Sequence, residues 1–162
     1  LWRYKIGDTV EFTCLNPFRI KITGRTKHFI NVFGEELVIE NAEKALSLTS
    51  ELTKSSISDY TVGPVFMGSK TKGSHEWLIE FDKQPDDLSK FMEILDLNLQ
   101  SLNSDYEAKR YKSSTLELPK LVVARKNLFY DWLSSKNKLG GQNKIPRLAN
   151  SREFIDELIS MN

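Results

Sequence analysis

Apolar positions recur along this chain with two periods, and the alternation between them predicts both strands and helices. Strand-like runs, rich in β-branched and aromatic residues or alternating in polarity, occupy residues 8–13, 18–23, 57–67, 75–81 and 116–123. Apolar residues at helical spacing occupy residues 42–54, 88–102 and 127–135, with a last helix after residue 150. After residue 36 the order is helix, strand, strand, helix, strand, helix. This order predicts an α+β fold: a small, mostly antiparallel sheet with helices packed on it, preceded by a short β-hairpin.

Turn residues indicate where several of these elements bend or end. Asn16-Pro17 separates the first two runs and predicts a hairpin turn. Asn41 is expected to cap the helix that follows it. Gly63-Pro64 is expected to force a bulge or bend into its strand, and Pro119 favours an edge position for the strand of residues 116–123.

Other local patterns make further predictions. Residues 75–81 alternate with Glu76 and Glu80 on one side, which is typical of a half-buried strand. Asn150 with Glu153 predicts a capping box for the last helix. Residues 104–115 show no clear period. Gly34 lies in a turn where a positive φ is expected.

Composition narrows the class of protein. The 162 residues fit one domain, or one domain with a piece of another, and 40% hydrophobic with 28% charged residues is ordinary for a globule. A net charge of +1 gives no global field to attract nucleic acid or anionic lipid. No apolar run approaches the roughly 20 residues of a membrane span. Cys14 is the only cysteine, so the cytoplasm is the expected setting, and the start at Leu1 indicates excision from a longer chain.

Two motifs near the N-terminus could hold a nucleotide. Tyr4-Lys5-Ile6-Gly7-Asp8 places a carboxylate in a glycine turn, and a carboxylate accepts hydrogen bonds from two ribose hydroxyls. Gly24-Arg25 follows, and the planar guanidinium binds phosphate in a bidentate way. Taken alone, the first motif also fits an ordinary turn before a strand, and the second a surface arginine after a turn.

A third motif lies near the C-terminus, in the run Gly140-Gly141-Gln142-Asn143-Lys144-Ile145-Pro146-Arg147. A compact ammonium group such as that of Lys144 can offset negative charge that builds up at a phosphate during reaction. Taken alone, Lys144 also fits a solvated loop lysine.

In this order the motifs resemble the hinge and C-terminal domain of the adenylate-forming enzymes. The resemblance is closest to the auxin-responsive acyl-acid amido synthetases of plants and their bacterial relatives. It implies that Asp8 and Arg25 bind ATP, that Lys27 occupies the hinge and that Lys144 is catalytic. Many relatives carry Asp at the hinge, and the wider superfamily has Ser/Thr-Gly-Lys before the loop lysine, where this chain has Gln142-Asn143-Lys144. Lys144-Ile145-Pro146-Arg147 instead resembles the Lys-Thr-Pro-Arg tetrad of the amido synthetases.

The resemblance implies a ligase that uses ATP and Mg²⁺ to form an acyl-adenylate from a carboxylic acid and then an amide with an amino acid. Residues 1–24 would be the terminal strands of a large N-terminal domain, and residues 25–162 a mobile C-terminal lid domain. The partners would be the rest of the same chain and small substrates, with no nucleic acid and no membrane. The fragment alone is expected to be inactive. Two alternatives stay open: an adenylating ligase that makes a thioester, and a non-catalytic α+β module that binds a ligand or partner.

Other candidate residues lack a supporting pattern. His28 and His75 have no Cys or His at metal-ligand spacing, so no metal site is expected. Cys14 has no paired histidine in view. Glu35 and Glu36 are expected to be solvated charges.

Overall fold

The computed structural model describes residues 8–25, 29–69, 71–113, 115–140 and 144–162, and it confirms an α+β fold. The strands are β1 (Asp8–Leu15), β2 (Phe18–Arg25), β3 (Phe29–Ile30), β4 (Leu37–Val38), β5 (Ser56–Val65), β6 (Ser74–Lys83) and β7 (Lys120–Ala124). The helices are α1 (Ile39–Thr53), α2 (Leu88–Leu102), α3 (Ser104–Arg110), the 3₁₀ turn η1 (Tyr111–Ser113), α4 (Leu128–Ser135) and α5 (Glu153–Met161).

The central sheet has three strands in the order β5-β6-β7. β5 and β6 form the predicted antiparallel hairpin, whereas β7 runs parallel to β6. The expected bulge at Gly63-Pro64 is wrong, because pairing with β6 is regular there and shifts only between Ser56 and Asp59. Pro64 is tolerated because its carbonyl points away from β6, toward Arg152, so the missing N–H interrupts no β5–β6 bond.

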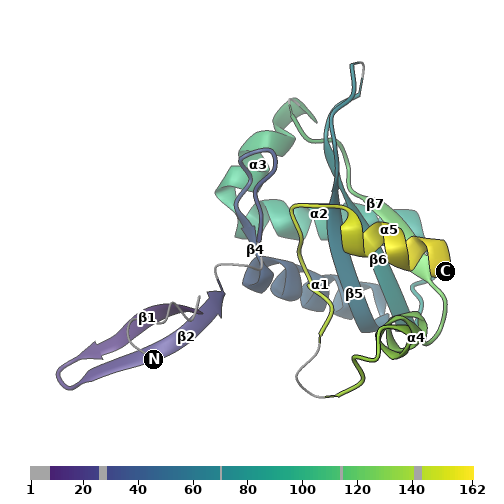
Figure 1. Ribbon diagram of the computed structural model, residues 1–162. Coiled ribbons are helices and arrows are strands. Elements are labelled where there is room, and N and C mark those ends of the chain that lie inside the picture. Colours follow the sequence, from purple (N-terminus) through teal and green to yellow (C-terminus); the bar gives the residue numbers. More distant parts are fainter. Residues whose placement is uncertain (1–7, 26–28, 70, 114, 141–143) are drawn as a thin grey trace.

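Helices cover both faces of this sheet (Figure 1). On one face α1 and α2 pack over Trp77 and Ile79 of β6, which are fully buried. On the other face α4 and α5 pack over Leu78. The prediction of a half-buried strand is therefore wrong: Glu80 is only 7% exposed, and its carboxylate accepts a 2.7 Å hydrogen bond from the backbone N–H of Asn127.

Helix α2 begins where the sequence predicts, and α1 begins slightly earlier. Asp87 caps α2, and its side chain accepts a hydrogen bond from the backbone N–H of Lys90. Helix α1 has Val38 rather than Asn41 at its N-cap. Asn41 lies in the first turn, and its side chain accepts from the backbone N–H of Val38 at 3.5 Å. The asparagine still stabilises the helix start, but from inside the helix.

Two further local predictions differ from the structure. Residues 104–110 form α3, which packs against α2 and buries Tyr106. Asn150 does not cap α5, whose N-cap is Arg152 without a side-chain bond. Asn150 instead accepts from the backbone N–H of Asn31 at 2.8 Å and donates to the carbonyl of Phe29 at 2.9 Å. It therefore ties the last loop of the chain to the segment around β3.

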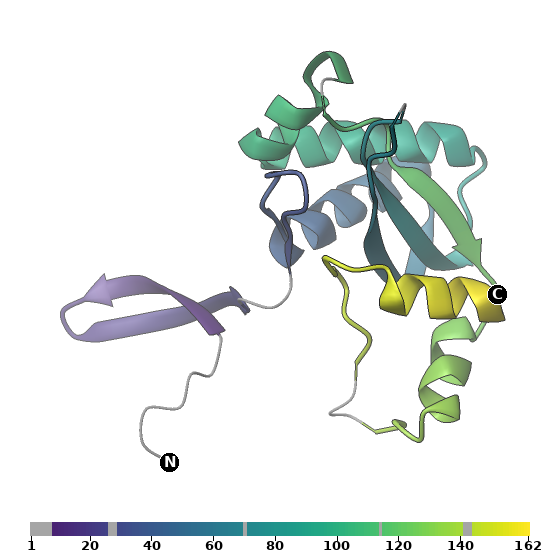
Figure 2. The same ribbon diagram turned by 45° about the horizontal axis from the view of Figure 1, so that its top comes forward.

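The hairpin of β1 and β2 projects away from the rest of the described chain in both views (Figures 1 and 2). Its turn lies at the predicted Asn16-Pro17, between the ends of the two strands. The hairpin exposes six large apolar side chains, all at least 48% accessible: Val10, Phe12, Leu15, Phe18, Ile20 and Ile22. Nothing in the described part of the chain covers this apolar surface.

Candidate functional site

The segment of residues 145–149 lies along the outer edge of β5, the edge that does not pair with β6. The backbone N–H of Val62 donates to the carbonyl of Arg147 at 2.9 Å, and the N–H of Ala149 donates to the carbonyl of Val62 at 3.1 Å. The hydroxyl of Thr61 donates to the carbonyl of Pro146 at 2.7 Å. Val62 and Leu148 form a parallel bridge, so the segment runs in the same direction as β5.

Two apolar side chains anchor this edge segment in the core. Leu148 is fully buried in the cluster formed with α1 and α2, and Ile145 is 7% exposed in the cluster formed with α4 and α5. The segment therefore joins the hydrophobic clusters on the two faces of the sheet.

Arg147 fixes the same segment through its side chain. Its guanidinium forms an ion pair with Asp59 and donates to the carbonyl of Tyr60 at 3.2 Å. The guanidinium also lies over the ring of Tyr60, 4.6 Å from the ring centre. Burial raises the pKa of the Tyr60 hydroxyl, so this ring stays neutral beneath the cation.

Lys144 stands immediately before this anchored stretch. Its side chain is exposed, and it makes no hydrogen bond or ion pair with any residue that the structure describes. The backbone of Lys144 is held by its buried neighbour Ile145, and its ammonium group has no partner among the described residues. It can therefore bind an anionic group presented from outside.

The predicted nucleotide-binding residues lie in the hairpin. Asp8 and Arg25 are partners in the β1–β2 register, so the backbone places the two positions opposite each other. The structure describes only the backbones of these two residues, and Lys27 lies outside the described residues. The hairpin of β1 and β2 and the edge of β5 are separate features in both views (Figures 1 and 2).

A buried hydrogen-bonded pair, Glu35 and His75, was missed by the sequence analysis. Glu35 is fully buried, not solvated as expected, and one carboxylate oxygen lies 2.8 Å from Nε2 of His75. The other oxygen accepts from the backbone N–H of Phe33 at 2.7 Å. Burial alone would raise the pKa of Glu35, but the hydrogen bond and charge of His75 lower it overall. Gly34 has the expected positive φ, which turns the chain so that Glu35 points inward.

A second polar network lies beside this pair. The carboxylate of Asp96 accepts from the hydroxyl of Tyr106 at 2.7 Å and from two nitrogens of Arg110, each at 2.8 Å. The Tyr106 ring packs against the His75 ring, with centroids 5.7 Å apart. Burial raises the pKa of Tyr106 far above its ordinary value. These groups join α2, α3 and β6, and their mutual contacts indicate a structural role.

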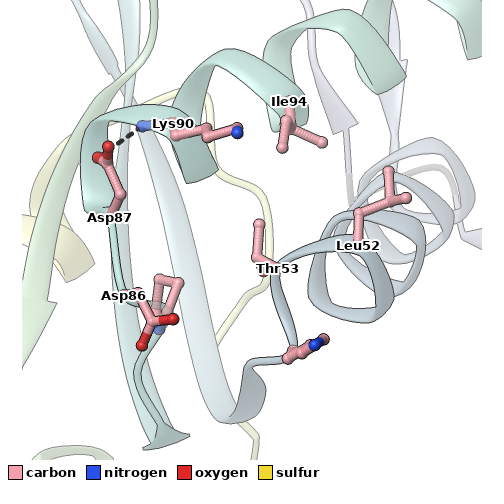
Figure 3. A pocket seen from close by; sticks show the side chains of 8 residues that line it. Leu52, Thr53, Asp86, Asp87, Lys90 and Ile94 are labelled. Atoms are coloured by element: carbon pink, nitrogen blue, oxygen red, sulfur yellow. Dashed lines mark hydrogen bonds between the residues drawn. The ribbon is translucent and has the colours of Figure 1, made fainter.

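A surface depression of about 400 Å³ separates the end of α1 from the start of α2 (Figure 3). Its lining contains Leu52, Thr53, Lys54, Pro85, Asp86, Asp87, Lys90 and Ile94. None of the predicted site residues belongs to it. The Asp87 carboxylate already caps α2 (Figure 3). The depression is therefore a weaker candidate for the functional site than the edge segment.

The described residues contain neither a cluster of metal ligands nor a helix that could span a membrane. No group of three or more His, Cys, Asp or Glu side chains within the described ranges could hold a metal ion. No helix in the described part of the chain is long and apolar enough to cross a membrane.

Together these features define an α+β domain that carries an exposed lysine on a segment fixed to the edge of its sheet. A sequence model described as the GH3 family C-terminal domain matches residues 40–153. The chain belongs to the GH3 family and contains this C-terminal domain.

Solved structures agree with this assignment at the level of the fold. The chain is similar to a structure named GH3.15 acyl acid amido synthetase, with a TM-score of 0.77 and 19% identity, over 99% of this chain and 31% of that one. It is also similar to a structure named AtGH3.15 acyl acid amido synthetase in complex with 2,4-DB, with a TM-score of 0.74, 19% identity and coverages of 99% and 30%. The chain thus spans about a third of the length of these structures. The comparison with curated proteins gave no match.

Proposed function

We propose that this chain is the C-terminal part of an ATP-dependent acyl-acid amido synthetase. Residues 1–24 would be the last strands of its large N-terminal domain, and residues 25–162 its mobile lid. Membership of the GH3 family supports the proposal, as does a fold shared over nearly the whole chain with structures named as amido synthetases. The observation that carries it is the exposed Lys144 on its anchored edge segment.

The proposed reaction has two steps. The carboxylate of the acyl acid attacks the α-phosphate of ATP, giving an acyl-adenylate and pyrophosphate. The amine of an amino acid then displaces AMP and leaves an amide. Lys144 acts in the first step, where its ammonium group stabilises the negative charge that grows on the phosphate oxygens. Movement of the lid between the steps would bring Lys144 to the phosphate and take it away again.

Asp8 and Arg25 are assigned to the ribose of ATP, and Lys27 to the hinge. The opposed positions of Asp8 and Arg25 in the hairpin support a common role, because the backbone register pairs the two residues across neighbouring strands. We assign Mg²⁺ to the rest of the enzyme, since the described residues offer no cluster of ligands for it.

The exposed apolar surface of the hairpin supports the proposed domain boundary. Side chains such as Phe12 and Phe18, at 58% and 77% exposure, are expected to be covered by a larger body. The matched structures are about three times as long as this chain. We infer that the hairpin packs on the large domain while the remainder forms the lid.

The site therefore needs both parts of the enzyme. The 162-residue chain alone is expected to form no acyl-adenylate, because the acyl pocket and most ATP contacts would lie in the large domain. The complete enzyme would act on small carboxylic acids and amino acids in the cytoplasm.

The test is ATP–pyrophosphate exchange by the complete enzyme that carries this chain, across a panel of aromatic and aliphatic carboxylic acids. Lys144→Ala should slow exchange by at least about a hundredfold, the scale of losing one charge-stabilising group in a reaction site. Amide formation from supplied acyl-adenylate should be nearly unchanged. Lys138→Ala, which removes another exposed lysine of the same loop, should leave both reactions unchanged.

Exchange that no acid stimulates, in a folded enzyme that binds ATP, would contradict adenylation. Equal loss of both half-reactions in Lys144→Ala would contradict the role given to Lys144. Product analysis completes the assignment: an amide supports the proposal, and a thioester with a thiol acceptor contradicts it.

A further inference from the structure

We propose that Arg147 is a positioning residue that holds Lys144 at the reaction site by fixing the edge segment to β5. This inference rests on the proposed function, because it assumes that Lys144 acts in adenylation. Arg147 would act through Lys144 and would not itself touch the nucleotide.

The backbone hydrogen bonds hold only part of the segment, so the contacts of Arg147 with Asp59 and Tyr60, here called the clamp, matter for the rest. Hydrogen bonds from Val62 and to Val62 fix residues 147 and 149, and the bond from Thr61 fixes the carbonyl of Pro146. Lys144 lies beyond the last of these bonds. Any sliding or lifting of residues 145–147 along the edge of β5 would therefore displace the lysine.

The side chain of Arg147 resists both movements. Because the segment runs parallel to β5, residues 147 and 61 are neighbours, and Asp59 lies farther back along β5, toward the Lys144 end. The ion pair with Asp59 thus holds the guanidinium toward Lys144 along the strand direction. Stacking over the Tyr60 ring holds it perpendicular to that direction. Asp59 and Tyr60 are consecutive residues of one strand, so the clamp has a rigid base.

The surroundings of the clamp favour positioning over direct binding. One terminal nitrogen of Arg147 serves both the carboxylate of Asp59 and the carbonyl of Tyr60. The side chains of Arg147 and Asp59 are 30% and 36% exposed, so water can reach the pair but most of it is covered. A guanidinium that is neutralised by a carboxylate and held against a ring has little freedom to follow a moving phosphate.

The test uses a mutant cycle in the complete enzyme with Arg147→Gln, Asp59→Asn, Lys144→Ala and the double variant of Arg147 and Lys144. Arg147→Gln should lower kcat for ATP–pyrophosphate exchange about tenfold to a hundredfold, as expected when a catalytic group is displaced by about 1 Å. The KM for ATP should stay near the wild-type value. Asp59→Asn should act in the same direction.

Two readouts separate positioning from a general loss of structure. Amide formation from supplied acyl-adenylate should be unaffected by Arg147→Gln. In the Lys144→Ala background, adding Arg147→Gln should cause no further loss of exchange, because a residue acting through Lys144 has nothing left to position.

Arg152 provides the matched control. It lies on the other side of the same loop, pairs with Glu76 and Asp156 at 2.6 Å and donates to the carbonyl of Pro64 at 3.0 Å. It therefore anchors α5 to the sheet without contacting the segment that carries Lys144. Arg152→Gln should leave exchange unchanged even if it lowers thermal stability.

The outcomes separate this inference from the proposed function. If Lys144→Ala abolishes exchange but Arg147→Gln does not lower it, positioning by Arg147 is wrong and the proposed function stands. Multiplying losses in the double variant would show that Arg147 acts on the nucleotide independently, which overturns positioning. Equal losses in Arg147→Gln and Arg152→Gln would also overturn it. If Lys144→Ala leaves exchange unchanged, the role of Lys144 fails, and the inference fails with it.

Discussion

At the scale of single residues, the Glu35–His75 pair shows how this domain handles a buried charge. Both side chains have no exposed surface, and the second oxygen of Glu35 is satisfied by the backbone N–H of Phe33. Removing one partner leaves the other buried without its hydrogen bond, which typically costs about 1–3 kcal/mol. The pair also connects the loop after β3 to β6. We therefore expect it to stabilise the fold strongly.

Glu35→Ala should accordingly lower the free energy of unfolding by about 1–3 kcal/mol, since it leaves His75 buried without its carboxylate partner. Urea denaturation of the purified chain near neutral pH measures this change. Glu36→Ala is the matched control: Glu36 is the next residue, its side chain is exposed, and its loss should change stability by less than about 0.5 kcal/mol. Equal effects of the two substitutions would show that the buried pair contributes nothing.

The same residue should give stability a pH dependence of known sign. The pKa of Glu35 is lower in the folded chain than its ordinary value of 4.5, so the folded state binds the proton less well. Its contribution is therefore complete above pH 4.5 and is lost as the pH falls below 4.5, through the lowered folded pKa. The difference in unfolding free energy between wild type and Glu35→Gln should shrink as the pH falls below 4.5. A difference that grows on acidification would contradict the assignment.

At the scale of elements, the approach of α5 to β5 depends on a glycine. A Cβ atom added at Gly63 would lie 2.8 Å from Cγ2 of Ile155. Ile155 is β-branched and buried, so it has little freedom to turn away. Gly63→Ala should therefore destabilise the chain by about 1–3 kcal/mol, the usual cost of overpacking. Thermal and urea denaturation measure the loss.

A double-mutant cycle with Ile155→Ala tests whether the clash with Ile155 causes the loss of stability in Gly63→Ala. Ile155→Ala alone should destabilise the chain by leaving a cavity, but it removes the atom that a new Cβ would strike. The double variant should consequently be more stable than the sum of the two single losses predicts. Strict additivity would show that the cost of Gly63→Ala comes from elsewhere in the strand.

The elements also show what the sequence can predict. Helix α2 and the hairpin of β5 and β6 were found because their apolar periods are long and regular. Helix α3 was missed because it has only seven residues and one fully buried aromatic, Tyr106. The parallel pairing of β7 with β6 depends on a crossover through α2 and α3, which strand patterns do not encode.

In the candidate site, too, some features could be predicted from the sequence and others could not. Lys144 was found from a local motif of consecutive residues, and its assignment remains a prediction. The partner of Arg147 could not be found, because Asp59 is 88 residues away and joins it only when residues 145–149 pack on β5. Glu35 was expected to be solvated since isolated glutamates usually are, and only the fold places His75 beside it. The sequence thus predicts residues that belong to a local motif, but it does not predict contacts between residues far apart in the chain.

At the scale of the whole molecule, the chain combines a packed domain with a projecting hairpin. Among the described residues, the helices and the sheet from β5 onward share two hydrophobic clusters, and neither cluster includes a residue of β1 or β2. The hairpin instead projects from the packed domain (Figure 2), and its apolar side chains are exposed. Stability of the packed domain should therefore be nearly independent of the hairpin, whereas solubility should depend on it.

Removing residues 1–25 tests this division. The shortened chain should keep a single cooperative unfolding transition, with Tm within about 4 °C of the complete chain, which for this size corresponds to roughly 1 kcal/mol. It should also bind less of a hydrophobic dye, because Phe12, Phe18 and Ile22 are gone. Removing residues 153–162 is the control: it takes α5 and the buried Ile155 out of the core, so the cooperative transition should be lost. A hairpin deletion that behaves like the α5 deletion would show that the hairpin is part of the lid itself, and the boundary proposed near residue 24 would have to be abandoned.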